Sequence, residues 1–582
     1  MTTSVGPVLL GGYAAKQCPV RTQNDHLPIA ARWEPSPEDQ ARLDAGIEFE
    51  EQVFDQILAA HPGAVLVDPQ LRHQAAITAT IEAMRAGAPL ILGGWLPDDP
   101  AGGRKGRPDI LVAVEGGYLP ADVKHHRSAE PKARKATQVA PLVAPSAWAP
   151  LEGWSAATIY RYSDGLQLAH YSRSLQACNF HPGGHRMWGA VVGSTRLAAG
   201  GQPEDVVFVW HDLAEPLAYT FSRSSDTGKK RRSLLERYDH EHRFRVKIAE
   251  AALEATARGD MTNLLVDPVG QGECRKCPYE TVCAEQMGPE DPSALLTVGN
   301  LDTREWLTLR RMGIATTTDL AELDPTDDAG FFDDYSREVA HRGRDTARSR
   351  LAGAISRAQM IRDGLHITPV GPTLVEVPDA GIEVDLDIEW DVQDRTYMWG
   401  ARIRVGGDDT TAEYVVFADW SADFDGPAEY ELAAQVADWL REQRRRAEAA
   451  GKTLRVFHWS SPEPSRLRRI LGADATADLL DSDTGVFTDL EDVFKTGFLS
   501  LHGSSIKKVA PHFGFSWSVD DPGGAISQHY LNTLRTNDTG AAHAKDWLLS
   551  YNADDCTAMT VIRDGMRTWP APPDSVVPAD YS

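Results

Sequence analysis

A glycine turn between two strand-like segments predicts a β-hairpin over residues 106–124. The first segment is apolar from residue 110 to residue 114, Gly116-Gly117 is a typical turn, and the second segment ends at Lys124. Because side chains alternate across a strand, we expect Asp122 and Lys124 on one face, with Asp109 beside them at the start of the first strand. This part of the chain is therefore expected in a sheet that gathers two acids and a lysine at one end.

Two carboxylates and a lysine in this arrangement suit phosphodiester hydrolysis. Carboxylate oxygens bind Mg²⁺ or Mn²⁺, and such an ion activates water and screens the phosphate charge. A lysine can position the water or stabilise the developing negative charge. The alternative is that the D…D-x-K string occurs by chance on a surface hairpin.

Pro108-Asp109 followed by Asp122-Val123-Lys124 resembles the PD-(D/E)xK pattern of RecB-like nucleases. This resemblance implies a restriction-endonuclease-like domain in which Asp109 and Asp122 hold Mg²⁺ or Mn²⁺. Lys124 would then stabilise the attacking water or the transition state. Glu50, on a helix predicted to begin near residue 46, matches the family's additional acidic residue at the metal.

A later segment resembles the Q-x-x-x-Y helix of the same family, with Gln167 and Tyr171 in the two named positions. Residues four apart lie on one face of a helix. The resemblance therefore implies that both side chains contact the substrate strand.

Three cysteines form a C-x₂-C-x₅-C cluster, at Cys274, Cys277 and Cys283. Thiols this close in sequence favour metal ligation in a reducing compartment, and zinc is a common choice. A subset of RecB-like nucleases has one cysteine before the nuclease core and this cluster after it, and Cys18 takes that earlier position. The resemblance implies a [4Fe–4S] cluster on these four thiolates, with zinc as the alternative.

A second acidic pattern lies in the strand predicted over residues 384–390, where acidic and apolar residues alternate. Asp385, Asp387 and Glu389 share one face, and three adjacent carboxylates repel one another unless a cation bridges them. Asp387-x-Glu389 and Tyr551-x₃-Asp555 resemble two motifs of ribonuclease H-like exonucleases of the DEDD type.

That resemblance implies a metal site built from Asp387, Glu389 and Asp555, with a tyrosine that orients water. The family's second acidic motif is not matched, and Glu463 is the nearest candidate for it. The alternative is therefore an inactive domain that keeps the fold and binds nucleic acid.

These patterns together predict an α/β multidomain protein of 582 residues. We expect a restriction-endonuclease-like domain at 1–290, a helical connector at 291–372 and a ribonuclease H-like domain at 373–582. The connector, beginning with residues 296–301, resembles a helix–hairpin–helix, and the alternative is a plain helical spacer. No P-loop motif is present, so any helicase motor is expected to act in trans.

The net charge of −25 argues against nucleic acid or an anionic membrane covering the whole surface. A local basic run stands out against it and is expected to contact the backbone of a nucleic-acid strand. This basic run consists of Lys229, Lys230, Arg231 and Arg232.

No apolar run is long enough to span a membrane and no signal peptide is recognisable, so a cytoplasmic protein without a membrane partner is expected.

The sequence thus predicts a metal-dependent deoxyribonuclease that cuts DNA, single-stranded and from an end, in repair, recombination or defence. One alternative is a non-catalytic nucleic-acid-binding adaptor. The other is an RNA-directed nuclease that uses the C-terminal acidic site.

Overall fold

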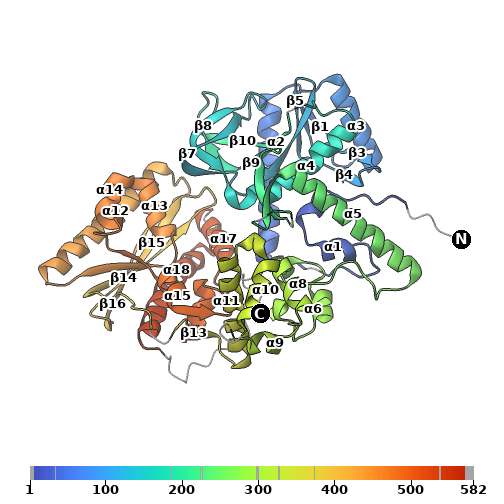
Figure 1. Ribbon diagram of the computed structural model, residues 1–582. Helices are drawn as coiled ribbons and strands as arrows, with labels where there is room; N and C mark the ends of the chain where they lie inside the picture. The colour runs from blue at the N-terminus through green and yellow to red at the C-terminus, as the bar shows by residue number, and fades with distance from the viewer. Residues whose placement is uncertain are drawn as a thin grey trace. The chain divides into compact units, whose positions relative to one another are not determined.

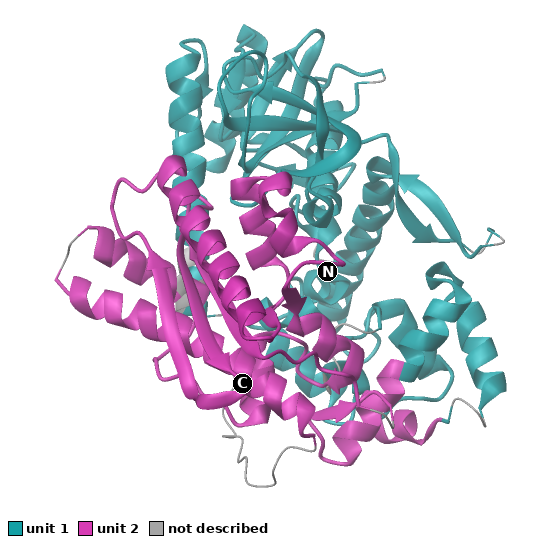
Figure 2. Cartoon of the chain, turned by 90° about the vertical axis from the view of Figure 1, so that its left-hand side faces the viewer, with its two compact units in different colours: residues 1–316, 324–352 teal, residues 317–323, 353–582 magenta. Residues whose placement is uncertain are grey.

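The computed structural model of the chain describes residues 6–32, 34–184, 186–222, 224–225, 227–295, 301–324, 328–371, 374–536 and 539–569. The chain divides into two compact units (Figure 2). Unit 1 comprises residues 1–316 and 324–352, and unit 2 comprises residues 317–323 and 353–582. None of the described helices is long and apolar enough to cross a lipid bilayer.

Unit 1 is built around an eight-stranded mixed sheet with the order β1-β2-β5-β6-β9-β10-β7-β8 (Figure 1). The predicted hairpin is confirmed, because β5 pairs antiparallel with β6 and Val114 lies opposite Gly117. β6 then runs parallel to β9, with a helix in the crossover between them. The strands are β1 (Val65–Leu66), β2 (Leu90–Leu92), β5 (Ile110–Val114), β6 (Gly117–Lys124), β7 (Ala129–Pro141), β8 (Ala149–Ala156), β9 (Trp188–Leu197) and β10 (Asp205–Asp212).

Helices cover both faces of this sheet. Apolar side chains of α2 (Pro37–Ala60) pack with Leu119 and Ala121 on one face, whereas α3 (His73–Ala86) and α4 (Thr158–Ala177) pack on the other. The helix that carries Glu50 begins earlier than residue 46, because Ser36 caps it by accepting a hydrogen bond from the backbone N–H of Asp39.

The remaining elements of unit 1 frame the sheet. Two short ribbons join β3 to β4 and β11 to β12. The elements are η1 (Ala14–Lys16), α1 (Pro19–Asn24), β3 (Leu96–Asp99), β4 (Arg104–Gly106), β11 (Pro216–Phe221), β12 (Lys229–Ser233), α5 (Leu234–Arg258), η2 (Gly272–Lys276), α6 (Glu280–Met287) and α7 (Pro292–Leu295).

The predicted connector is helical in its described part, and the two units share it. α8 (Thr303–Arg311) and α10 (Ala329–Glu338) belong to unit 1, α9 (Thr317–Glu322) belongs to unit 2, and α11 (Arg344–Arg362) begins in the first and ends in the second. Residues 296–300 of the predicted helix–hairpin–helix lie outside the described residues. The resemblance to that module and the three-domain division stay predictions.

Unit 2 contains a five-stranded sheet with the order β16-β15-β14-β17-β18. β14, β15 and β16 form an antiparallel meander, whereas β17 and β18 add to the other side of β14 in parallel. The strands are β14 (Ile382–Trp390), β15 (Thr396–Val405), β16 (Asp408–Ala418), β17 (Leu454–His458) and β18 (Phe487–Asp489).

The alternation predicted for β14 is confirmed. Val384, Leu386 and Ile388 pack in a core with α12, and the acidic residues between them face α18. Two further short strands, β13 and β19, pair with each other. The other elements are η3 (Ala340–Arg342) in unit 1 and, in unit 2, β13 (Ile367–Pro369), α12 (Gly426–Ala449), α13 (Pro462–Leu471), α14 (Ala473–Leu480), α15 (Leu490–Gly497), β19 (Phe498–Ser500), α16 (Ile506–Val509), η4 (Ala510–Phe513), α17 (Gly524–Arg535) and α18 (Ala541–Arg567).

Candidate functional site

The hairpin of unit 1 brings its two predicted acids and its lysine together. Lys124 Nζ lies 3.2 Å from Asp122 Oδ2 and 3.8 Å from Asp109 Oδ2. Asp109 is held in place because its carboxylate accepts a hydrogen bond from the backbone N–H of Val123. Asp122 is fully buried, and among the described residues no hydrogen bond reaches its Oδ1. A buried carboxylate oxygen that accepts no hydrogen bond is suited to bind a cation as a ligand.

Glu50 of α2 belongs to the same group of charges. Burial raises the pKa of Glu50, and the positive charges of Arg107 and Lys124 oppose that rise. Burial also raises the pKa of Asp109 well above its usual range, and repulsion from Asp122 adds to the effect. Two acids with a raised pKa, Glu50 and Asp109, thus share the surroundings of Asp122 and Lys124, and a divalent cation would lower the pKa of both.

A second lysine at this site escaped the sequence analysis. Lys16 of η1 donates a hydrogen bond of 2.7 Å to Gln167 Oε1, and Gln167 in turn donates to Tyr171 Oη at 3.0 Å. Burial, followed by repulsion from Lys124, lowers the pKa of Lys16 to about 8. No sequence signal pointed to it, because a single lysine far ahead of the hairpin carries no motif.

The Q-x-x-x-Y helix forms as predicted, but its two named side chains are covered. Gln167 is 2% exposed and Tyr171 is 4% exposed. Gln167 accepts the hydrogen bond of Lys16 and so holds this lysine near the acidic group. In the described conformation, Gln167 and Tyr171 therefore support the ammonium group of Lys16. Their direct contact with a substrate strand stays a prediction.

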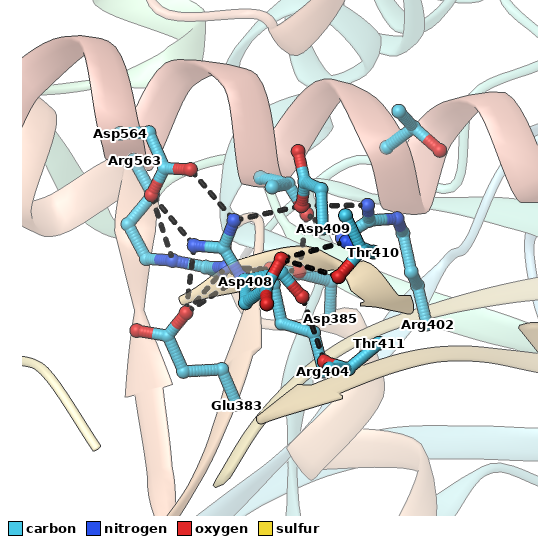
Figure 3. Close-up of polar contacts among 12 residues, drawn as sticks. Glu383, Asp385, Arg402, Arg404, Asp408, Asp409, Thr410, Thr411, Arg563 and Asp564 are labelled. Carbon is cyan, nitrogen blue, oxygen red and sulfur yellow. Dashed lines mark hydrogen bonds and ion pairs between the residues drawn. The ribbon is translucent and has the colours of Figure 1, made fainter. Parts of the chain in front are cut away.

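The acidic face of β14 in unit 2 is divided into two halves with different partners. Figure 3 shows the first half, in which Glu383 and Asp385 face buried arginines. Arg563 forms ion pairs with both acids, and Arg404 forms a 2.7 Å ion pair with Glu383. All four side chains are at most 1% exposed, so these acids are neutralised within the protein and are not available to a metal ion.

The second half of the row meets a carboxylate from α18. Oxygen atoms of Asp387, Glu389 and Asp555 lie within 4.8 Å of one another. Their hydrogen-bond donors are neutral groups of other elements, and no arginine among the described residues forms an ion pair with them. The donors are Asn552 Nδ2 to Asp387 at 2.7 Å, Ser527 Oγ to Glu389 at 3.0 Å and Trp517 Nε1 to Asp555 at 2.7 Å.

The pKa values at this cluster reflect burial and repulsion among its acids. Burial and the neighbouring Asp555 raise the pKa of Glu389 to about 8. Burial raises the pKa of Asp555 to about 6, although Lys507 partly offsets the increase. Asp387 shifts in the same direction for the same causes. A divalent cation would relieve this repulsion, and these three residues fit one as oxygen ligands.

Glu463 of α13 lies at the same cluster, as the sequence suggested for the missing acidic motif. Its charge contributes to raising the pKa of Asp387, and burial raises the pKa of Glu463 itself well above its usual range. Its Oε2 lies 3.6 Å from His458 Nδ1 and accepts no hydrogen bond from a described residue. Glu463 therefore influences the cluster electrostatically, but its carboxylate is not among the three whose oxygens lie within 4.8 Å of one another.

A family model described as "RNase_H superfamily" matches residues 422–567. Unit 2 contains a ribonuclease H-like domain. No curated protein and no solved structure matched the chain. The matched range runs from the region of α12 to the end of α18 and so includes Glu463, Lys507 and Asp555. The ribonuclease H-like domain indicates a nuclease-type hydrolase in general.

The match begins after the strand that carries the other two acids of the cluster. Asp387 and Glu389 lie on β14, and the structure places them against Asp555. The cluster is therefore completed by residues outside the matched range.

The four cysteines of the predicted cluster come from the two ends of the first block of sequence. Asn24 lies 3.7 Å from Cys283 Sγ, and the backbone N–H of Cys18 donates to Glu273 beside Cys274. Burial raises the pKa of Cys283 to about 12, with further contributions from Cys18, Cys277 and Cys274. However, no three of these sulfur atoms lie within 4.8 Å of one another in the described part of the chain. The compact tetrahedron that zinc requires is not formed, and these sulfur positions by themselves do not support the predicted [4Fe–4S] cluster.

The basic run lies on β12 of the β11–β12 ribbon. Lys229 Nζ and the Arg231 guanidinium each lie 5.4 Å from the ring centre of Tyr219, which is 65% exposed. Lys230 is exposed, whereas Arg232 is partly engaged in an ion pair with Glu236. An exposed aromatic ring between cations is a surface on which a nucleic-acid base can stack.

Proposed function

We propose that this protein is a divalent-metal-dependent nuclease that cleaves DNA, preferentially single-stranded and from an end. The observation that carries the proposal is the convergence of Asp387, Glu389 and Asp555 without an arginine partner in the ribonuclease H-like domain. Three neighbouring acids that no arginine of the described residues neutralises are costly to the fold, and a bound cation would offset that cost.

Within the ribonuclease H-like domain, Mg²⁺ or Mn²⁺ bound by these acids would polarise the phosphate and activate water. Lys507 lies close enough to counter the raised pKa of Asp387 and Asp555. Its ammonium also donates a hydrogen bond to Tyr551 Oη. We assign Lys507 the task of holding the tyrosine hydroxyl and neutralising charge on the non-bridging phosphate oxygens.

We propose a second nuclease site in unit 1, in a restriction-endonuclease-like domain. The support is the approach of Lys124 to both Asp109 and Asp122, together with the electrostatic influence of Glu50. The three acids would hold the divalent ion, and Lys124 would stabilise the attacking water or the pentavalent transition state. Lys16 would bind the phosphate of the incoming strand, for which it must be protonated.

We also propose that the substrate is DNA, that the protein acts in repair, recombination or defence, and that any helicase motor acts in trans. The exposed Tyr219 with Lys229 and Arg231 supports single-stranded substrate, because stacking requires unpaired bases. These contacts carry little sequence preference, as an end-directed nuclease would need.

A [4Fe–4S] cluster on Cys18, Cys274, Cys277 and Cys283 is also part of the proposal. It rests on the spacing of the four cysteines, on the neighbouring thiols that contribute to the raised pKa of Cys283, and on the Gln271 N–H, which lies 3.4 Å from Cys274 Sγ. Iron and acid-labile sulfide analysis of anaerobically purified protein tests it. A colourless protein with stoichiometric zinc would contradict it.

The proposed activity is tested with end-labelled single- and double-stranded DNA and RNA in Mn²⁺. Asp109→Ala and Lys124→Ala report on unit 1, and Asp387→Ala and Asp555→Ala report on the ribonuclease H-like domain. We expect the parent protein to cleave DNA. We expect the two variants of one site, in unit 1 or in the ribonuclease H-like domain, to reduce this cleavage by about 100-fold or more. Binding of DNA without cleavage by the parent protein would favour the adaptor alternative. RNA cleavage that only Asp387→Ala and Asp555→Ala abolish would favour the RNA-directed alternative.

A further inference from the structure

Three histidines from separate segments of unit 2 converge outside the acidic cluster. His366 immediately precedes β13, His502 follows β19, and His512 lies in η4. The two strands pair antiparallel, with Ile367 opposite Ser500. Backbone pairing continues beyond the strands, because Leu501 N donates to His366 O at 3.0 Å. Sheet pairing therefore fixes two of the histidines side by side, and η4 brings the third.

The imidazole nitrogens are close enough to share one ion. His366 Nδ1 lies 3.0 Å from His502 Nε2, and one nitrogen from each of the three rings falls within 4.8 Å of the others. A tetrahedral zinc ion with Zn–N bonds of about 2.0–2.1 Å places its donor nitrogens about 3.3 Å apart. The ring centroid of His366 lies 5.2 Å from that of His502 and 4.9 Å from that of His512, and the last two are 4.7 Å apart.

A hydrogen bond alone accounts for only part of this arrangement. One shared proton satisfies His366 and His502, but it leaves His512 stacked against both without a role. Among the described residues, no side-chain hydrogen bond occupies the ring nitrogens of His512. No carboxylate forms an ion pair with any of the three within the described part of the chain. A set of imidazoles without a carboxylate selects a transition metal over Mg²⁺ or Ca²⁺.

We propose that His366, His502 and His512 form a transition-metal site that takes Zn²⁺. Three protein ligands leave a fourth position for water. The segment between His502 and His512 carries Lys507, which reaches Tyr551 and the acidic cluster. The ion would therefore tie this segment to β13 and hold Lys507 in position. It is distinct from the Mg²⁺ or Mn²⁺ proposed for the acids.

The test is the number of Zn²⁺ ions bound by the full, untagged chain after dialysis against a chelator. Isothermal titration calorimetry is run in excess Mg²⁺, which occupies the acidic sites. We expect the parent to bind one equivalent more than His366→Ala, His502→Ala or His512→Ala. His529→Ala, which removes an exposed histidine of α17, is the matched control and should bind as the parent does.

Two further variants separate loss of the site from loss of the fold. His366 is exposed, so His366→Ala leaves the packing intact, and its thermal melt without metal should equal that of the parent. His512→Cys keeps a zinc ligand and should restore the lost equivalent. The proposal is overturned if His366→Ala binds as many zinc ions as the parent, or if His512→Cys behaves like His512→Ala.

Discussion

Asp385 and Asp387 lie two residues apart on the same face of β14, yet among the described arginines a partner is found only for Asp385. Arg563 of α18 forms an ion pair with Asp385, whereas Asp387 receives the neutral amide of Asn552 at 2.7 Å. The same helix thus neutralises one acid and gives the next only a neutral hydrogen-bond donor. We propose that this difference marks where the structural part of the strand ends and the metal-binding part begins.

Removing the charge of Asp387 should separate function from stability. Asp387→Asn is expected to abolish cleavage but to raise the free energy of unfolding of the metal-free protein by about 1 kcal/mol or more, since repulsion at the buried cluster is relieved. Urea unfolding in chelator, compared with the parent, measures the gain. A loss of stability would show that Asp387 has a structural partner instead.

Arg563 should behave in the opposite way. Arg563→Ala leaves Asp385 and part of the charge of Glu383 buried without a partner, so we expect a loss of about 3–5 kcal/mol in the free energy of unfolding. Arg445→Ala is the control, because Arg445 pairs with Glu442 on an exposed helix face and should change stability by about 0.5 kcal/mol or less. Equal effects of the two changes would contradict the assignment.

The acidic cluster predicts a pH dependence of stability. The folded-state pKa values of Asp555 and Glu389 are raised to about 6 and about 8, so the folded protein binds more protons than the unfolded chain in this range. The stabilising contribution is present below the ordinary carboxyl pKa and is lost as the pH rises to about 8. Thermal melts in chelator should show this decline, and Mn²⁺ should suppress it. An equally steep decline in Asp387→Asn/Glu389→Gln protein would place its cause elsewhere.

Lys16 predicts a separate pH effect at the site of unit 1. Its pKa of about 8 means that it loses its charge as the pH rises past that value, so DNA binding in Ca²⁺ should weaken between about pH 7 and 9. Lys16→Ala should reduce affinity about tenfold at pH 7, which corresponds to about 1.4 kcal/mol. Lys16→Arg stays protonated and should remove the decline. Unchanged pH dependence in Lys16→Arg would exclude Lys16 as its origin.

The β11–β12 ribbon should contribute to strand binding through stacking and charge. Tyr219→Ala is expected to cost about 1–3 kcal/mol in affinity for single-stranded DNA, and Lys229→Ala with Arg231→Ala should reduce the salt dependence of binding. Fluorescence anisotropy with labelled oligonucleotides at several salt concentrations measures both. Arg445→Ala with Arg446→Ala serves as the control of equal charge, because both arginines pair with Glu442.

The local patterns of the sequence determined several elements of the fold. The hairpin of β5 and β6 follows from an apolar run and a glycine turn, because turn chemistry and side-chain alternation act between near neighbours. The alternation along β14 likewise separated Val384 and Leu386 from the acids. These patterns placed Asp109, Asp122 and Lys124 on one ribbon before any tertiary contact was known.

Tertiary structure alone decided which charged groups act together. The sequence contains four acids on β14, and only the packing of α18 assigns Asp385 to Arg563 and Asp387 to a cluster with Asp555. Lys16 and the three histidines carried no signal, since long-range packing and not spacing brings them to their neighbours. The physical reason is that burial and the distance to a counter-charge set the behaviour of an ionisable group, and both are properties of the folded chain.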